Sequence, residues 1–98
     1  MPIAFGSDAI HDLPRYTRGT QAMMWIDSYV DAGLPPRAIL QAMTGTAARL
    51  LGVDRERGAI RVGLAADLIA VPGDPLADIQ TLKQVMFVMK DGRVIRSP

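Results

Sequence analysis

The chain contains no cysteine and only one histidine, His11, among its 98 residues. Without cysteine it has no disulfide, no thiolate nucleophile and no cysteine-ligated zinc site. A catalytic zinc normally binds three protein ligands, among which histidine dominates, so this chain does not supply a complete set of that kind. The lack of cysteine also fits the cytoplasm, which is the location we expect.

Long apolar runs, aromatic side chains and an excess of charge are scarce as well. No apolar run approaches the roughly 20 residues that span a bilayer, and no basic stretch precedes an apolar core at the N-terminus, so we expect neither a membrane span nor a signal peptide. The net charge is +1, the basic residues are spread out, and aromatic residues make up 5% of the chain. This pattern predicts no nucleic-acid or membrane partner. Apolar residues, in contrast, reach 49%, as in a globular domain.

Two helices are predicted in the first half of the chain, because apolar residues recur there at steps of three and four. The first begins near Thr17 or Thr20 and ends at Gly33. The second has two consecutive prolines at its entry and ends at Gly52. Gly45 lies inside the second helix, where glycine costs about 1 kcal/mol relative to alanine, and indicates close packing or a kink.

Short β segments lie at the start and in the second half of the chain. Residues 2–5 predict a buried strand, and 66–71 and 84–89 predict two more. The pair Asp91-Gly92 between apolar runs predicts a tight hairpin. Asp67, which follows a Gly/Ala turn, is expected to accept backbone N–H groups. A sheet of so few short strands does not cover both of its faces by itself, so we expect it to need another layer.

The first loop holds the candidate site. Asp8 follows the predicted strand 2–5 and Gly6, an arrangement that many barrel enzymes use to present a catalytic group. A metal site built from Asp8, His11 and Asp12 alone would be crowded and would lack support from other elements. The remaining acids are scattered rather than convergent, which argues against an all-oxygen Mg²⁺ site. There is also no G-x-S-x-G elbow and no glycine-rich phosphate loop with lysine. From these residues alone Asp8 is either part of a larger site or a cap of the loop.

Four stretches of the sequence match one family pattern in order. They are GSDA at 6–9, GLPPRAILQAMTGTAARLLGV at 33–53, GAIRVGLAADLIAVPGDPLADI at 58–79 and VMFVMKDGRVI at 85–95. The third is the most specific, since it contains G-x-I-x-x-G-x-x-A-D-L. Together they resemble the C-terminal segment of metal-dependent amidohydrolases, the superfamily of imidazolonepropionases, dihydroorotases and prolidase-like enzymes. Thr46 stands where the family pattern commonly has asparagine.

The resemblance implies an α/β fold that is incomplete as a free-standing unit. Residues 1–52 would form the terminal strand and helices of a (β/α)₈ barrel, whose active sites lie at the C-terminal ends of the strands. Residues 53–98 would form the C-terminal part of a small β-sandwich that both chain termini build in the family.

The resemblance also implies roles for residues of the first loop. Asp8 matches an aspartate that is a metal ligand or its neighbour, and also the base that activates the hydrolytic water. His11 and Arg15 would contact the substrate or support the metal ligands, although solvated loop residues are the alternative for both. The cofactor would be a divalent metal, with zinc expected. The family's paired histidines, bridging lysine or carboxylate and later histidines have no counterpart in this chain.

Two functions follow from these observations. The first is the C-terminal fragment of a metal-dependent amidohydrolase that cleaves an amide or cyclic C–N bond in a small, dipeptide-like substrate. This chain would then be inactive and metal-free alone, and its partner would be the missing N-terminal barrel portion. The alternative is a non-catalytic structural or interaction module that self-associates into a homo-oligomer and covers its sheet with a second copy, with Asp8 as a loop cap.

Overall fold

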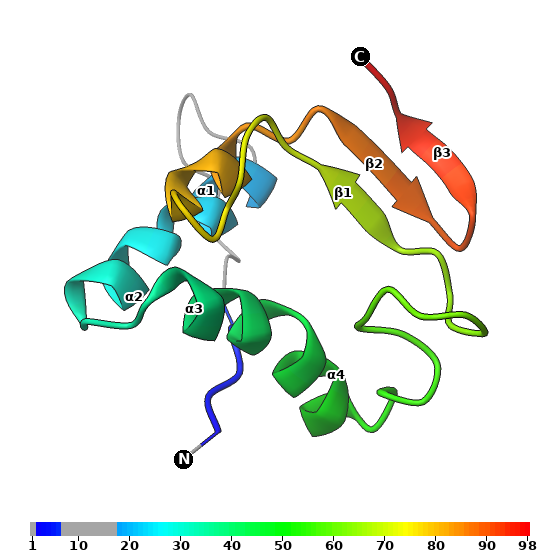
Figure 1. The fold of residues 1–98 in the computed structure, drawn as a ribbon, viewed down its shortest axis with the longest axis horizontal. Helices are drawn as coiled ribbons and strands as arrows, with labels where there is room; N and C mark the ends of the chain where they lie inside the picture. Colours follow the sequence, from blue (N-terminus) through cyan, green and yellow to red (C-terminus); the bar gives the residue numbers. More distant parts are fainter. Residues whose placement is uncertain (1, 7–17) are drawn as a thin grey trace.

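The computed structural model describes residues 2–6 and 18–98, and Figure 1 shows helices on one side and a small sheet on the other. The helices are α1 (Arg18–Met24), α2 (Ile26–Asp31), α3 (Pro36–Met43) and α4 (Gly45–Leu51). The strands are β1 (Leu68–Ala70), β2 (Phe87–Lys90) and β3 (Arg93–Arg96), with the 3₁₀ helix η1 (Ile79–Lys83) between β1 and β2. The chain is therefore an α/β chain in which all described helices but η1 precede the sheet.

Each predicted helix forms as two shorter ones. Trp25 separates α1 from α2, and Thr44, with φ −123° and ψ −92°, separates α3 from α4. The Thr44 hydroxyl donates a hydrogen bond of 2.7 Å to the carbonyl of Leu40, a contact that competes with the regular helical ladder. Gly33 and Gly52 have φ of +91° and +74°, and so end the helical segments in the left-handed conformation as predicted.

The three strands form an antiparallel sheet in the order β1-β2-β3. Ile69 lies opposite Val88, and the register shifts between Val88 and Met89. Asp91 and Gly92 connect β2 to β3 with φ of +49° and +76°. Positive φ at both positions is typical of a type I′ hairpin, so the predicted hairpin is confirmed.

The predicted strand over residues 2–5 is wrong for this structure. Residues 2–6 pair with no strand in the part of the chain that the structure describes. The segment lies against α3 instead, since the Phe5 N–H donates to the Ala42 carbonyl at 2.8 Å. An extended segment forms a strand only through a neighbouring strand, and none of the described strands lies beside this one.

The apolar core belongs to the helices rather than to the sheet. Its buried residues come from α2, α3 and η1, namely Ile26, Ile39, Ile79 and Leu82. In the sheet no residue is fully buried, and every residue of β3 is exposed. This agrees with the expectation that the sheet needs another layer. None of the helices in the described ranges is long and apolar enough to cross a membrane.

Candidate functional site

The three predicted site residues, Asp8, His11 and Arg15, lie outside the described residues, so their roles stay predictions. The structure does describe what flanks residues 7–17. On one side residues 2–6 are fastened to the C-terminal end of α3 through the Phe5 N–H. On the other side α1 begins at Arg18.

Within residues 2–6 and 18–98 the donor set does not fit a metal ion. No group of three or more His, Cys, Asp or Glu side chains gathers there. This part of the chain contains no cysteine and no histidine, since His11 is the only histidine of the sequence. Its two aspartates with shifted pKa values, Asp27 and Asp67, accept hydrogen bonds from lysines and N–H groups instead. The described residues therefore do not fit a metal site.

The densest charged cluster in the described ranges surrounds Asp67, whose side chain is 27% exposed. Its Oδ2 receives the Arg57 guanidinium at 2.8 Å and the Lys90 ammonium at 3.1 Å. Its Oδ1 accepts the backbone N–H of Asp91 at 2.9 Å. The predicted role of Asp67 as a backbone acceptor is thus confirmed. The two cations went unpredicted, because they come from positions 10 and 23 residues away in the sequence.

These contacts lower the pKa of the Asp67 carboxyl. The largest cause is the hydrogen bond from the Asp91 backbone, followed by the hydrogen bond from Lys90, while the charge of Arg57 adds a smaller effect. All three favour the ionised carboxylate. Asp67 is therefore held as an anion, in a structural setting rather than a catalytic one, because its lone pairs are occupied by neighbours from the chain itself.

A second polar contact joins α2 to η1. Asp27 accepts hydrogen bonds from Lys83 Nζ at 2.7 Å and from Gln80 Nε2 at 2.9 Å. These two donors, Lys83 first, lower the pKa of the Asp27 carboxyl. The ion pair lies over the apolar core to which α2 and η1 contribute, so it supports the packing of these helices.

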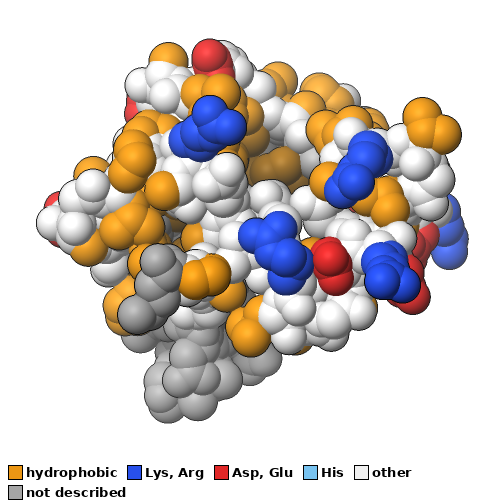
Figure 2. Space-filling view, turned by 60° about the horizontal axis from the view of Figure 1, so that its bottom comes forward, with side chains coloured by type: hydrophobic (Ala, Val, Ile, Leu, Met, Phe, Trp, Pro, Cys, Tyr) orange, Lys and Arg blue, Asp and Glu red, His pale blue; other side chains and the backbone are white. Residues whose placement is uncertain are grey.

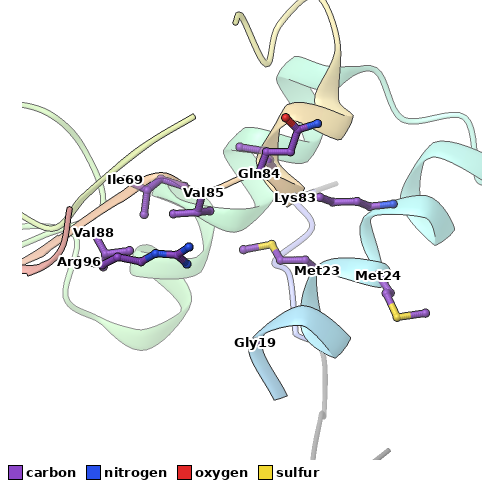
Figure 3. Close-up of a pocket in the computed structure, with 10 residues that line it drawn as sticks. Gly19, Met23, Met24, Ile69, Lys83, Gln84, Val85, Val88 and Arg96 are labelled. Carbon is purple, nitrogen blue, oxygen red and sulfur yellow. The ribbon is translucent and has the colours of Figure 1, made fainter. Parts of the chain in front are cut away.

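A hollow of about 540 Å³ lies between α1, the residues after η1 and the sheet (Figure 3). Met23 and Arg96 point into it from opposite sides, whereas Lys83 points away toward α2 (Figure 3). Among the described residues that line it there is no serine, threonine, histidine, cysteine or carboxylate. The described lining therefore offers no nucleophile and no acid/base pair.

Apolar side chains also lie open on the outside of the molecule. Figure 2 shows hydrophobic groups spread over one face, with single basic and acidic residues between them. The most exposed large ones are Val62 at 105%, Ile60 at 89%, and Leu50 and Leu51 at 75% each. Leu51 and Ile60 line the same groove, so α4 and the segment before β1 present part of this apolar surface together.

The model of the amidohydrolase family matches residues 1–95. Among solved structures, the chain is similar to a Xaa-Pro dipeptidase with bound methionine in its active site, at 36% identity and a TM-score of 0.77, over 83% of this chain and 20% of that one. It is similar to molinate hydrolase at 33% identity and a TM-score of 0.75, over 84% of this chain and 18% of that one. It is also similar to phenylurea hydrolase B at 29% identity and a TM-score of 0.73, over 84% of this chain and 18% of that one.

No curated protein sequence matches the chain significantly. The chain spans about a fifth of the length of the solved structures that it resembles.

Proposed function

Because the chain belongs to the amidohydrolase family, we propose that it supplies the C-terminal segment of a metal-dependent hydrolase that cleaves an amide or cyclic C–N bond. The observation that carries this proposal is the family match over residues 1–95, which includes almost the whole chain. In this proposal residues 1–52 complete the barrel and residues 53–98 complete the adjoining sandwich. The chain alone is inactive, since most of the site is contributed by the larger barrel portion.

The exposed surface supports a partner layer of that kind. The described core lies among helices, and the sheet contributes no fully buried residue to it. Strongly exposed apolar residues on α4 and before β1, such as Leu51 and Ile60, would become buried against the barrel portion. Burial of apolar surface contributes about 25 cal/mol for each Å² removed from water, so the association would be driven by these side chains.

The site residues of the proposal lie in the first loop. Asp8 is the proposed metal ligand and the base that takes the proton from water, and the remaining ligands come from the barrel portion. His11 and Arg15 are proposed to face the substrate, where the Arg15 guanidinium suits a carboxylate. A bound divalent metal, expected to be zinc, would polarise the carbonyl and acidify water.

The substrate class follows from the reaction and from one similar enzyme. The similar Xaa-Pro dipeptidase is named for a dipeptide substrate, so a small dipeptide with C-terminal proline is the first compound to test. Such a substrate has a free carboxylate, which is the group that Arg15 would bind.

Native mass spectrometry of the protein purified from its source under non-denaturing conditions tests the proposal. It reports chain mass, stoichiometry and bound metal together. We expect this chain in a metal-bearing complex with a larger chain, or as part of one, and hydrolysis of an Xaa-Pro dipeptide by that complex. Metal-free homo-oligomers of the 98-residue chain would instead support the self-associating module and overturn a catalytic role.

A further inference from the structure

The tip of the β2–β3 hairpin is fastened to the start of β1 through polar contacts that converge on Asp67. The Asp91 N–H donates to Asp67 Oδ1 at 2.9 Å, and the Gly92 N–H donates to the carbonyl of Ala66 at 3.0 Å. Lys90, the last residue of β2, reaches Asp67 Oδ2 at 3.1 Å. Both turn residues of the hairpin therefore use their N–H groups to bind the segment that leads into β1.

Arg57 links this hairpin tip to the helical side of the molecule. Its guanidinium contacts Asp67 Oδ2 at 2.8 Å and Asp91 Oδ1 at 3.3 Å. The next residue, Gly58, lies directly against α4, since a Cβ there would come within 2.5 Å of the Ala48 Cβ. Arg57 thus extends from a segment packed on α4 to two carboxylates of the sheet.

Apolar packing does not provide the same connection. The buried cluster lies in α2, α3 and η1, and β3 is exposed along its whole length. Arg57, Asp67, Lys90 and Asp91 carry two positive and two negative charges, so the cluster is neutral as a whole when all four are ionised. We propose that Asp67 is a polar anchor, and that its charge holds the tip of the β2–β3 hairpin on the start of β1 and on the segment after α4, in addition to the ladder that pairs β2 with β1.

The charges around Asp67 determine how the stabilisation of the hairpin tip depends on pH. The groups that face it are the cations Arg57 and Lys90 and the Asp91 backbone N–H, with the Asp91 carboxylate on the far side of Arg57. These donors hold the pKa of Asp67 below that of an ordinary aspartate. The stabilisation is therefore complete above the unfolded-state pKa and is lost as the pH falls through the lower folded-state pKa.

Amide hydrogen exchange of the 98-residue chain, resolved by residue, tests the anchor. We expect Asp67→Ala to speed exchange at the Asp91 and Gly92 amides by about tenfold or more, with little change at core amides of α3 such as Ile39. Asp67→Asn keeps an oxygen acceptor but loses the charge. We expect it to give a smaller increase at the same two amides, because the oxygen still accepts the Asp91 N–H while the charge that holds Arg57 and Lys90 is gone.

Asp78→Asn is the matched control. Asp78 also accepts a backbone N–H two residues ahead, from Gln80 at 3.0 Å, and makes no ion pair within the described ranges. We expect it to leave the hairpin amides unchanged. Unchanged exchange at Asp91 and Gly92 in Asp67→Ala would overturn the anchor. So would an equal rise at the α3 amides in both Asp67→Ala and Asp67→Asn, because that result would describe global unfolding rather than release of the hairpin.

Discussion

At the scale of single residues, the described part of the chain uses its acids as acceptors for its own donors. Asp27 and Asp67 each bind a lysine and at least one N–H group, and both have lowered pKa values for that reason. Neither carboxylate is free to bind a metal or to take a proton from water without giving up these partners. The acid proposed for catalysis, Asp8, belongs to a different part of the sequence.

The ion pair between Asp27 and Lys83 predicts a specific dependence on pH. Asp27→Asn removes the charge but keeps an oxygen for Gln80. Because the folded-state pKa of Asp27 is lowered, the lost stabilisation is present at pH 7 and disappears in wild type as the pH falls through that pKa. We expect a lower Tm than wild type at pH 7, by a few degrees at most for an exposed pair, and equal Tm values near pH 2.

Thermal unfolding at both pH values measures this difference. Asp54→Asn serves as the control, since Asp54 is exposed and has no ion pair within residues 2–6 and 18–98. A Tm difference between Asp27→Asn and wild type that is the same at both pH values would contradict the electrostatic explanation.

At the scale of elements, the segment between α4 and β1 packs closely against α4 at Gly58. Gly58 has φ of +101°, and its Cα lies against Ala48 of α4. A side chain at this position would be strained in its backbone and would also displace α4. Gly58 is therefore as sensitive to substitution as a core position, although it has no side chain to bury. Its close contact with α4 places the neighbouring Arg57 where it reaches the sheet.

Gly58→Ala should lower the free energy of unfolding by about 2 to 3 kcal/mol, from the positive φ and the overlap with Ala48 together. Gly45→Ala is the matched control, because it lies at the start of α4 and its new Cβ would meet only the flexible end of Arg49 at 3.8 Å. We expect Gly45→Ala to stabilise the chain by about 0.5 kcal/mol. Urea unfolding of the two variants measures this difference. Equal unfolding midpoints would contradict the close contact between Gly58 and Ala48.

The packing of α3 on α2 and η1 makes Ile39, together with Ile26, one of the two most buried large apolar positions of the described chain. Ile39 is 0% exposed and lies in the buried cluster. Ile39→Ala should cost about 2 to 5 kcal/mol, from lost burial and from the cavity that remains. Ile60→Ala, at a side chain that is 89% exposed, should change stability by less than about 0.5 kcal/mol in the isolated chain. Urea denaturation measures both, and a small effect at Ile39 would mean that the helices pack differently.

Local chemistry made some of these elements predictable from the sequence. The turn at Asp91-Gly92 and the helix ends at Gly33 and Gly52 depend on residues that tolerate positive φ, so a few neighbouring letters suffice. The break at Trp25 was not predicted, because its apolar neighbours follow the helical period without interruption. Gly45 indicated close packing or a kink in the second helix, and that helix breaks beside it, at Thr44. The strand over residues 2–5 was predicted wrongly. Its apolar composition is that of a strand, but a strand also needs a neighbouring strand from elsewhere in the chain, which local composition does not reveal.

At the scale of the whole molecule, the resemblance predicted the family, and the match over residues 1–95 confirms it. The candidate site is different, because Asp8, His11 and Arg15 stay predictions and their proposed partners belong to a larger barrel. The sequence could point to one carboxylate through its motif, but a metal site is built from residues that converge from several strands. The chain spans about a fifth of the length of the solved structures that it resembles, so its own residues predict a single member of such a site.

Activity of the assembled hydrolase tests the role of Asp8. Asp8→Asn in the complete enzyme should lower kcat/KM for an Xaa-Pro dipeptide by about 100-fold or more, because a general base typically contributes that much. Asp12→Asn, at an aspartate four residues further along the sequence, should leave the rate within about threefold. Equal losses of kcat/KM in the two variants would contradict the role assigned to Asp8. Measuring the metal content of both variants shows whether Asp8→Asn has lost the general base alone or the bound metal as well.

The exposed strand β3 has a consequence for the solubility of this chain. It lies at the edge of the sheet, and such edges tend to recruit strands from other molecules into aggregates. Arg93 and Arg96 stand at its two ends around Val94 and Ile95, so charge repulsion between copies opposes stacking of this apolar pair. We therefore expect the two arginines to disfavour fibril formation by this edge.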